Sequence, residues 1–161
     1  MSFVRINENG YLTEKHLTFN VTYYDQSAPT ARLTYNGDFS YTVYDGKAVI
    51  DEYSGNAKTV TVPAKVDNYP VSEIGNRAFQ YSSFQSIVIP ASVQKINVAA
   101  FGNCRKPTSI VLEGTDLQFA NNSLYRATAD VYYRPDSCFQ AEELRQNYGG
   151  NITWKVMCAV E

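Results

Sequence analysis

A short motif recurs along the middle of the chain at a nearly constant spacing. Ile74 and Ile96 are 22 residues apart, as are Phe79 and Phe101, and Phe119 follows Ile96 after 23 residues. A period of this length, with apolar residues at fixed positions, is typical of a solenoid in which each repeat stacks on the one before it. The repeat therefore predicts a stack of short strands and turns.

Each repeat contains two strand-like pieces. In one piece alternate residues are apolar, and because side chains alternate across a strand we expect those residues to point inward. The inward set is Val60, Val62, Ile87, Ile89, Ile110 and Leu112. The outward row is then Thr61, Val88, Val111 and, in a partial fourth unit, Tyr132. The second piece centres on Ile74, Ile96 and Phe119, and an Ala-Phe pair after it places a large ring inside a turn.

The segments that flank the repeats predict two caps. Apolar alternation over residues 17–23 and 31–35, with an Asn36-Gly37 turn, indicates a small antiparallel unit over residues 1–38. Downstream, Ser137-x-x-Gln140 matches a capping box and Gly149-Gly150 is a helix stop. We therefore expect a helix over residues 139–148 with Leu144 facing the core, and then a strand over residues 151–156. The predicted division is 1–38, 39–135 for the repeats, and 136–161.

The repeats resemble those of a known family. Residues 89–101 read Ile-Pro-x-x-Val-x-x-Ile-x-x-x-Ala-Phe, residues 71–79 follow the same pattern, and Gly102-Asn103-Cys104 fits the turn after it. This pattern is similar to the BspA-like leucine-rich repeat. Pro107, Glu113 and residues 120–129 depart from it. The resemblance implies a mainly β fold with a short leucine-rich-repeat-like β solenoid. With the caps predicted from the flanking segments, the expected fold is this solenoid with an N-terminal β appendage and a C-terminal helix–strand cap.

Composition excludes several classes of function. The net charge is −2 and the basic residues are scattered, which argues against a nucleic-acid partner. No apolar run approaches the roughly 18 residues of a membrane span, so we expect no membrane insertion. His16 is the single histidine and Cys-x-x-Cys is absent, so no metal site or other cofactor is expected.

Chemistry that would support catalysis is also missing from the sequence. The adjacent carboxylate pairs at residues 51–52 and 142–143 read as solvated surface, and His16 reads as a solvent-facing strand residue. Cys104, Cys138 and Cys158 are an odd number without a short-range pair, so we expect free thiols. We therefore expect no catalytic residues and a protein that is not an enzyme.

Two functions remain open. The resemblance implies a non-enzymatic macromolecule-binding or adhesin-like module at the cell surface or outside the cell, whereas the absent signal peptide favours a structural accessory protein of a phage virion or tail. A cytoplasmic location follows if Met1 is the natural start. The partner would be a protein, a glycan or a second copy of the chain. The candidate binding face is the outward row of Thr61, Val88, Val111 and Tyr132. The alternative is that this row packs against the flanking segments.

Overall fold

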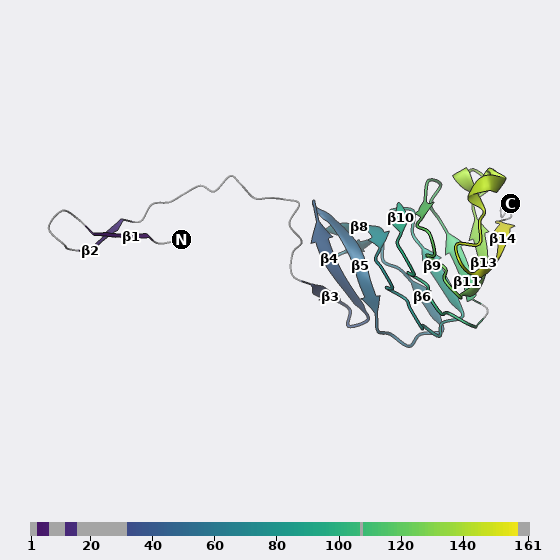
Figure 1. Cartoon of the computed structure of the whole chain (residues 1–161), viewed down its shortest axis with the longest axis horizontal. Coiled ribbons are helices and arrows are strands. Elements are labelled where there is room, and N and C mark those ends of the chain that lie inside the picture. Colours follow the sequence, from purple (N-terminus) through teal and green to yellow (C-terminus); the bar gives the residue numbers. More distant parts are fainter. Residues whose placement is uncertain (1–2, 7–11, 16–31, 107, 158–161) are drawn as a thin grey trace.

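The computed structural model describes residues 3–6, 12–15, 32–106 and 108–157. From β3 (Leu33–Tyr35) onward the chain winds into a stack of coils in which two sheets are joined by turns (Figure 1). The described part of the chain is almost entirely strand and turn, with two single-turn 3-10 helices. The solenoid prediction and the mainly β class are confirmed.

One sheet contains five parallel strands, one from each coil. They are, in chain order, β6 (Thr59–Thr61), β9 (Ser86–Ile89), β11 (Thr108–Leu112), β13 (Thr128–Tyr133) and β14 (Asn151–Val156). Equivalent residues face each other, so Ile87 pairs with Ile110 and Ile110 with Val131. The repeat spacing in the sequence thus becomes strand register in the structure.

The other sheet begins with an antiparallel hairpin and continues as parallel strands. β3 (Leu33–Tyr35), β4 (Phe39–Tyr44) and β5 (Lys47–Tyr53) are antiparallel, and β8 (Tyr69–Ile74), β10 (Lys95–Ile96) and β12 (Gln118–Phe119) then add in parallel to β5. The predicted Asn36-Gly37 turn joins β3 to β4, with both residues at positive φ. The extra residues of the first repeat form a small hairpin of β7 (Lys65–Val66) with β8.

The core lies between the two sheets and is filled as the alternation predicts. The six inward residues of the first strand piece are all at most 4% exposed, and Ile74 and Ile96 are fully buried. The Ala-Phe pairs place Phe79 and Phe101 in a parallel stack with ring centroids 5.3 Å apart. Phe84 closes this stack edge-on, 5.8 Å from Phe79.

The turns that follow β8, β10 and β12 are also stacked by backbone hydrogen bonds. The amide of Phe79 donates to the carbonyl of Ala100 at 2.8 Å, and the amide of Phe101 donates to that of Ser123 at 3.0 Å. Each of these three turns holds two non-glycine residues at positive φ, four positions apart: Arg77 and Tyr81, Ala99 and Asn103, and Asn122 and Arg126. The turn is therefore a repeated structural unit as regular as the strands.

The predicted C-terminal helix is wrong. Residues 138–144 form two 3-10 turns, η1 (Cys138–Gln140) and η2 (Glu142–Leu144), separated by the extended Ala141. Ser137 does not cap a helix, because its hydroxyl donates to Arg134 O at 2.7 Å, and Gln140 donates to Pro135 O. Such local side-chain bonds to the backbone compete with helix formation.

The remainder of the predicted cap is also different from the expectation. Leu144 is 38% exposed and does not face the core. The strand at residues 151–156 is present, but as β14 it continues the five-stranded sheet. The helix–strand cap as a unit is therefore not found, and the last coil ends the stack.

The N-terminal segment contains a hairpin of β1 (Phe3–Ile6) and β2 (Leu12–Lys15). The predicted strand over residues 17–23 and His16 lie outside the described residues. β3, which the prediction assigned to the appendage, pairs with β4 of the solenoid sheet. The division at residue 38 stays a prediction.

Candidate functional site

The four outward residues form one continuous row across the five-stranded sheet. Thr61 pairs with Val88, Val88 with Val111, and Val111 with Tyr132. Thr61 is exposed and the other three are half-buried, in contrast to their fully buried inward neighbours. The described segments therefore leave the row open to solvent, and the structure brings together all four residues that the sequence singled out.

A second row, of small polar side chains, runs beside this one. Ser86, Ser109, Asp130 and Thr153 face one another in register on the same side of the sheet. The outer face of the sheet thus offers a mostly apolar strip bordered by three hydroxyl groups and one carboxylate. This combination of an apolar centre and a polar border is typical of protein-binding surfaces.

Lys155 ends the row at β14, a position that the sequence analysis did not identify. It pairs with Tyr132, and its ammonium lies 5.5 Å from the centre of the Tyr132 ring. The same Nζ donates to Asp130 Oδ2 at 2.8 Å, which raises the pKa of the lysine. Both partners of this ion pair are about 43% exposed, so it contributes little to stability. Its effect is to hold one charge pair beside the tyrosine.

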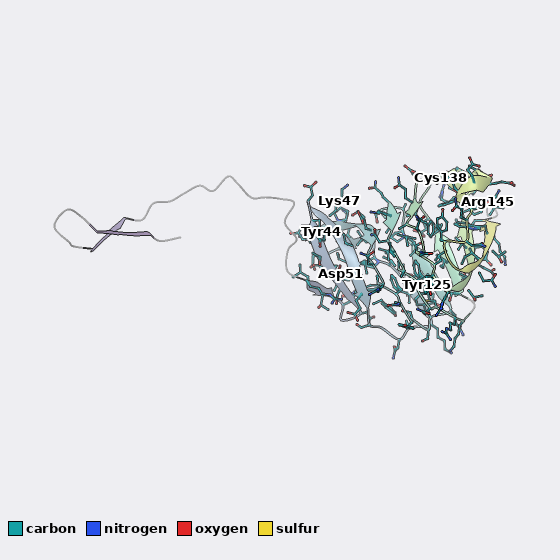
Figure 2. The ribbon with its side chains drawn as sticks, in the orientation of Figure 1. Tyr44, Lys47, Asp51, Tyr125, Cys138 and Arg145 are labelled. Atoms are coloured by element: carbon teal, nitrogen blue, oxygen red, sulfur yellow. The ribbon has the colours of Figure 1, made fainter. Side chains whose placement is uncertain are left out.

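The outer face of the other sheet, which contains β4, β5 and β8, carries a shallow hollow of about 340 Å³. Its polar lining includes Tyr44, Asp51, Glu73, Asn76 and Asn97. Thr42 Oγ1 donates to Asp51 at 2.6 Å, and Asn97 Nδ2 donates to Glu73 at 2.7 Å. Figure 2 shows Tyr44 and Asp51 at the β4–β5 end of the molecule. Both carboxylates are thus held by neutral donors.

Sequence reasoning missed this hollow because it joins a hairpin to the repeats. Its residues come from β4, β5, β8 and the turns that follow β8 and β10. Asp45-Gly46 at positive φ forms the tight turn that folds β4 onto β5. An Asp-Gly pair between two alternating segments is a hairpin signal that could have located one wall of the hollow.

The other residues considered for chemistry are dispersed. Glu52 pairs with Arg32 at 2.6 Å, and Glu142 and Glu143 are exposed in η2. Cys104 is buried, and burial raises the pKa of its thiol to about 11, well away from that of a reactive thiolate. Cys104 and Cys138 are both free thiols, and Cys158 lies outside the described residues.

Within the described residues, no cluster of three or more His, Cys, Asp or Glu side chains has a geometry that could hold a metal ion. No helix in the same part of the chain has the length and apolar character to cross a membrane.

Comparison with known proteins identifies the repeats. Residues 53–146, more than half of the chain, match the family described as the BspA type leucine rich repeat region (six copies). The comparison with curated proteins found no significant match.

Two solved structures share the fold. One is a leucine-rich repeat protein from Bacteroides capillosus, with a TM-score of 0.56 and 19% identity over 80% of this chain and 100% of the other. Another is a leucine rich cell surface protein from Faecalibacterium prausnitzii, with a TM-score of 0.50 and 20% identity over 79% of this chain. The match spans 42% of that longer protein.

The strand register, the stacked Ala-Phe turns and the match over residues 53–146 agree with one another. The chain belongs to the BspA type leucine-rich repeat family.

Proposed function

We propose that this protein is a non-enzymatic binding module of the adhesin-like type. Its partner is a macromolecule, either a protein, a glycan or a second copy of the chain. The module contacts that partner through the outer face of the five-stranded sheet, centred on Thr61, Val88, Val111 and Tyr132. The observation that carries the proposal is the register of these four residues on adjacent strands.

The geometry favours an extended partner over a small substrate. Adjacent strands lie about 4.8 Å apart, so the row presents a regular strip several strands wide. Inward side chains are committed to the core, which leaves the outward positions for recognition. Tyr132 at one end of the strip offers a rigid ring with a polar tip, the type of residue that often anchors an interface.

Location at the cell surface is part of the proposal. It is supported by the Faecalibacterium neighbour, which is a leucine rich cell surface protein. Leucine-rich repeats generally mediate protein interactions through exposed, repetitive faces. A role in a phage virion or tail has no supporting observation among the structural neighbours.

The proposal is tested by the double variant Val88→Glu with Val111→Glu. Two carboxylates on the strip would have to be desolvated in a complex, so association should be lost while the fold survives. The matched control is Gln94→Glu with Gln118→Glu, which adds the same two charges at exposed positions near the other sheet.

Circular dichroism of both variants would first establish that each remains folded. Light scattering then measures self-association, and an immobilised panel of host proteins and glycans measures partner binding. Loss of association in the Val88/Val111 variant alone supports the strip as the interface. Unchanged association in that variant, or equal loss in both, contradicts it.

A further inference from the structure

Charge is divided unevenly between the two edges of the solenoid. The three turns that follow β8, β10 and β12, residues 75–85, 97–106 and 120–127, contain no Asp or Glu, and their basic residues are Arg77, Arg105, Lys106 and Arg126. The connections at the opposite edge, residues 62–68, 90–94, 113–117 and 134–144, contain six acidic and two basic residues. In a chain of net charge −2, one edge is therefore basic.

Backbone hydrogen bonds bring these basic turns together. The amide of Tyr81 donates to Gly102 O at 2.9 Å, and the amide of Asn103 donates to Tyr125 O at 2.8 Å. Residues that are more than 20 positions apart in sequence are thus neighbours on this edge. In Figure 2, Tyr125 marks the lower edge, away from Cys138 and Arg145 at the upper edge.

A hollow of about 340 Å³ lies between the first two of these turns. Tyr81 is 71% exposed, the largest exposed fraction among the large hydrophobic residues described. The side chains that line the hollow also include hydroxyl, amide and cationic groups. The lining residues are Tyr81, Ser82, Ser83, Asn103, Arg105 and Lys106.

The cations at this edge are not neutralised from within the protein. Of the salt bridges formed by described residues, none includes any of the four basic residues of these turns. Arg126 lies over the ring of Tyr125 at 5.0 Å, an arrangement that leaves its charge available. Unpaired cations in a hollow favour an anionic ligand, since each is free to form a charge-assisted hydrogen bond.

We propose that this hollow binds an acidic saccharide, that is, a sugar chain that carries carboxylate or sulfate groups. Arg105 and Lys106 contact the anionic groups, and Ser82, Ser83 and Asn103 bond the ring hydroxyls. The exposed face of Tyr81 packs against a sugar ring. An acidic peptide would need the cations alone, whereas the ring and the three neutral polar side chains fit a sugar. This site is distinct from the strip on the five-stranded sheet.

The test uses the full chain with a heparin-type octasaccharide and an oligogalacturonate of equal length, which separate sulfate from carboxylate recognition. A neutral maltooctaose, polyglutamate and single-stranded DNA serve as comparisons. In a nuclear magnetic resonance titration, at least one acidic saccharide should shift the backbone amide resonances of Tyr81, Ser82, Ser83 and Asn103. Raising the salt concentration should weaken the binding, because screening acts on exposed charges.

Variants then assign the contacts. Arg105→Gln with Lys106→Gln should weaken saccharide binding by about tenfold or more, since charged hydrogen bonds are lost. Tyr81→Ser should weaken binding of the saccharide but not of polyglutamate. The matched control, Lys65→Gln with Lys95→Gln, removes two exposed charges elsewhere and should change affinity by less than twofold.

Several results would overturn the proposal. They are no binding of either acidic saccharide at low salt, equal weakening by the Lys65/Lys95 control, or tighter binding of polyglutamate or DNA than of saccharide. The amides that report saccharide binding, those of Tyr81, Ser82, Ser83 and Asn103, lie in the turns and outside the strip on the five-stranded sheet. Failure of this site is therefore distinguishable from failure of the proposed interface.

Discussion

The central coils and the C-terminal end of the solenoid pack aromatic rings in different ways. In the centre, Phe79 and Phe101 stack on each other inside the core, and each is at most 1% exposed. At the end, Phe119 stacks on Tyr148 and meets Trp154 edge-on, yet all three rings stay partly exposed. Of these five rings, the two that are followed by another coil are completely buried, and the three at the end are not.

The cause of this difference is the one-dimensional architecture. Each coil buries its inner face against its two neighbours, so the last coil lacks one neighbour. β14 ends the five-stranded sheet, and Val156 within it is 48% exposed. The two 3-10 turns shield part of this end through Phe139, which stacks on Trp154 at 5.0 Å. Stability should therefore fall from the centre toward the C-terminal end.

The largest expected effect is that of Phe101→Ala. Removing this buried ring leaves a cavity inside the central stack and should lower the free energy of unfolding by about 3–5 kcal/mol. Urea melts of the variant and the parent chain measure the difference. A loss below about 1 kcal/mol, the range of surface substitutions, would show that the central stack is not closed.

Trp154→Ala, at the C-terminal end of the solenoid, should lower the free energy of unfolding by a smaller amount. Its ring is half-buried, and its indole N–H donates to Gln146 O at 3.0 Å. We expect a loss of about 1–3 kcal/mol, less than for Phe101→Ala, because part of the ring already contacts water. The same urea melts test this ranking, and equal or greater loss for Trp154→Ala would reverse it.

Tyr41→Phe tests how the β4–β5 hairpin is attached to the repeats. Tyr41 is fully buried at its ring, and its hydroxyl donates to Asp67 in the inserted β7–β8 turn. The variant should lose about 1–2 kcal/mol, since the exposed carboxylate of Asp67 can turn to water.

This contribution should also depend on alkaline pH. The hydrogen bond to Asp67, together with burial, raises the pKa of Tyr41 from 10.0 to about 12. Because the folded-state pKa is the higher one, the contribution is complete below pH 10 and is lost as the pH rises toward 12. The difference between parent and Tyr41→Phe should therefore shrink over that window in thermal melts. A constant difference would mean that the hydrogen bond is not formed.

The smallest perturbation is thiol labelling, which compares Cys104 in the centre with Cys138 at the end. Cys104 is 2% exposed with a pKa of about 11, whereas Cys138 is half-buried. In the folded protein, alkylation should reach Cys138 well before Cys104. Mass spectrometry of peptides after timed labelling gives the order. Faster labelling of Cys104, or a disulfide between the two, would contradict the closed centre.

The repeated part of the fold was predictable from sequence because two independent periods agree. The alternation in Ile87 and Ile89 sets the face of each strand, and the 22-residue spacing sets which strands pair. Together they also predicted the register of the row from Thr61 to Tyr132, since residues at equal repeat positions must face each other.

The features that were missed depend on backbone conformation and distant contacts. Arg77, Tyr81 and Ala99 adopt positive φ. Residues of these types rarely do so, and their presence in a sequence therefore does not predict it. The stacking of the turns, and with it the basic hollow, could therefore not be predicted from the sequence. The predicted helix failed because a helical sequence pattern over residues 139–148 does not reveal that Ser137 and Gln140 bond the preceding backbone.

Residue-resolved amide hydrogen exchange tests the central claim most directly, namely that each coil is stabilised by the next one. The amides of Phe79 and Phe101 bond to the following turn, whereas those of Asn151 and Met157 bond the last strand to the body. We predict that the Phe79 and Phe101 amides exchange only through global unfolding, about 100-fold more slowly than those of Asn151 and Met157. Equal protection of both pairs would show that the C-terminal end is as closed as the centre, and would contradict the account.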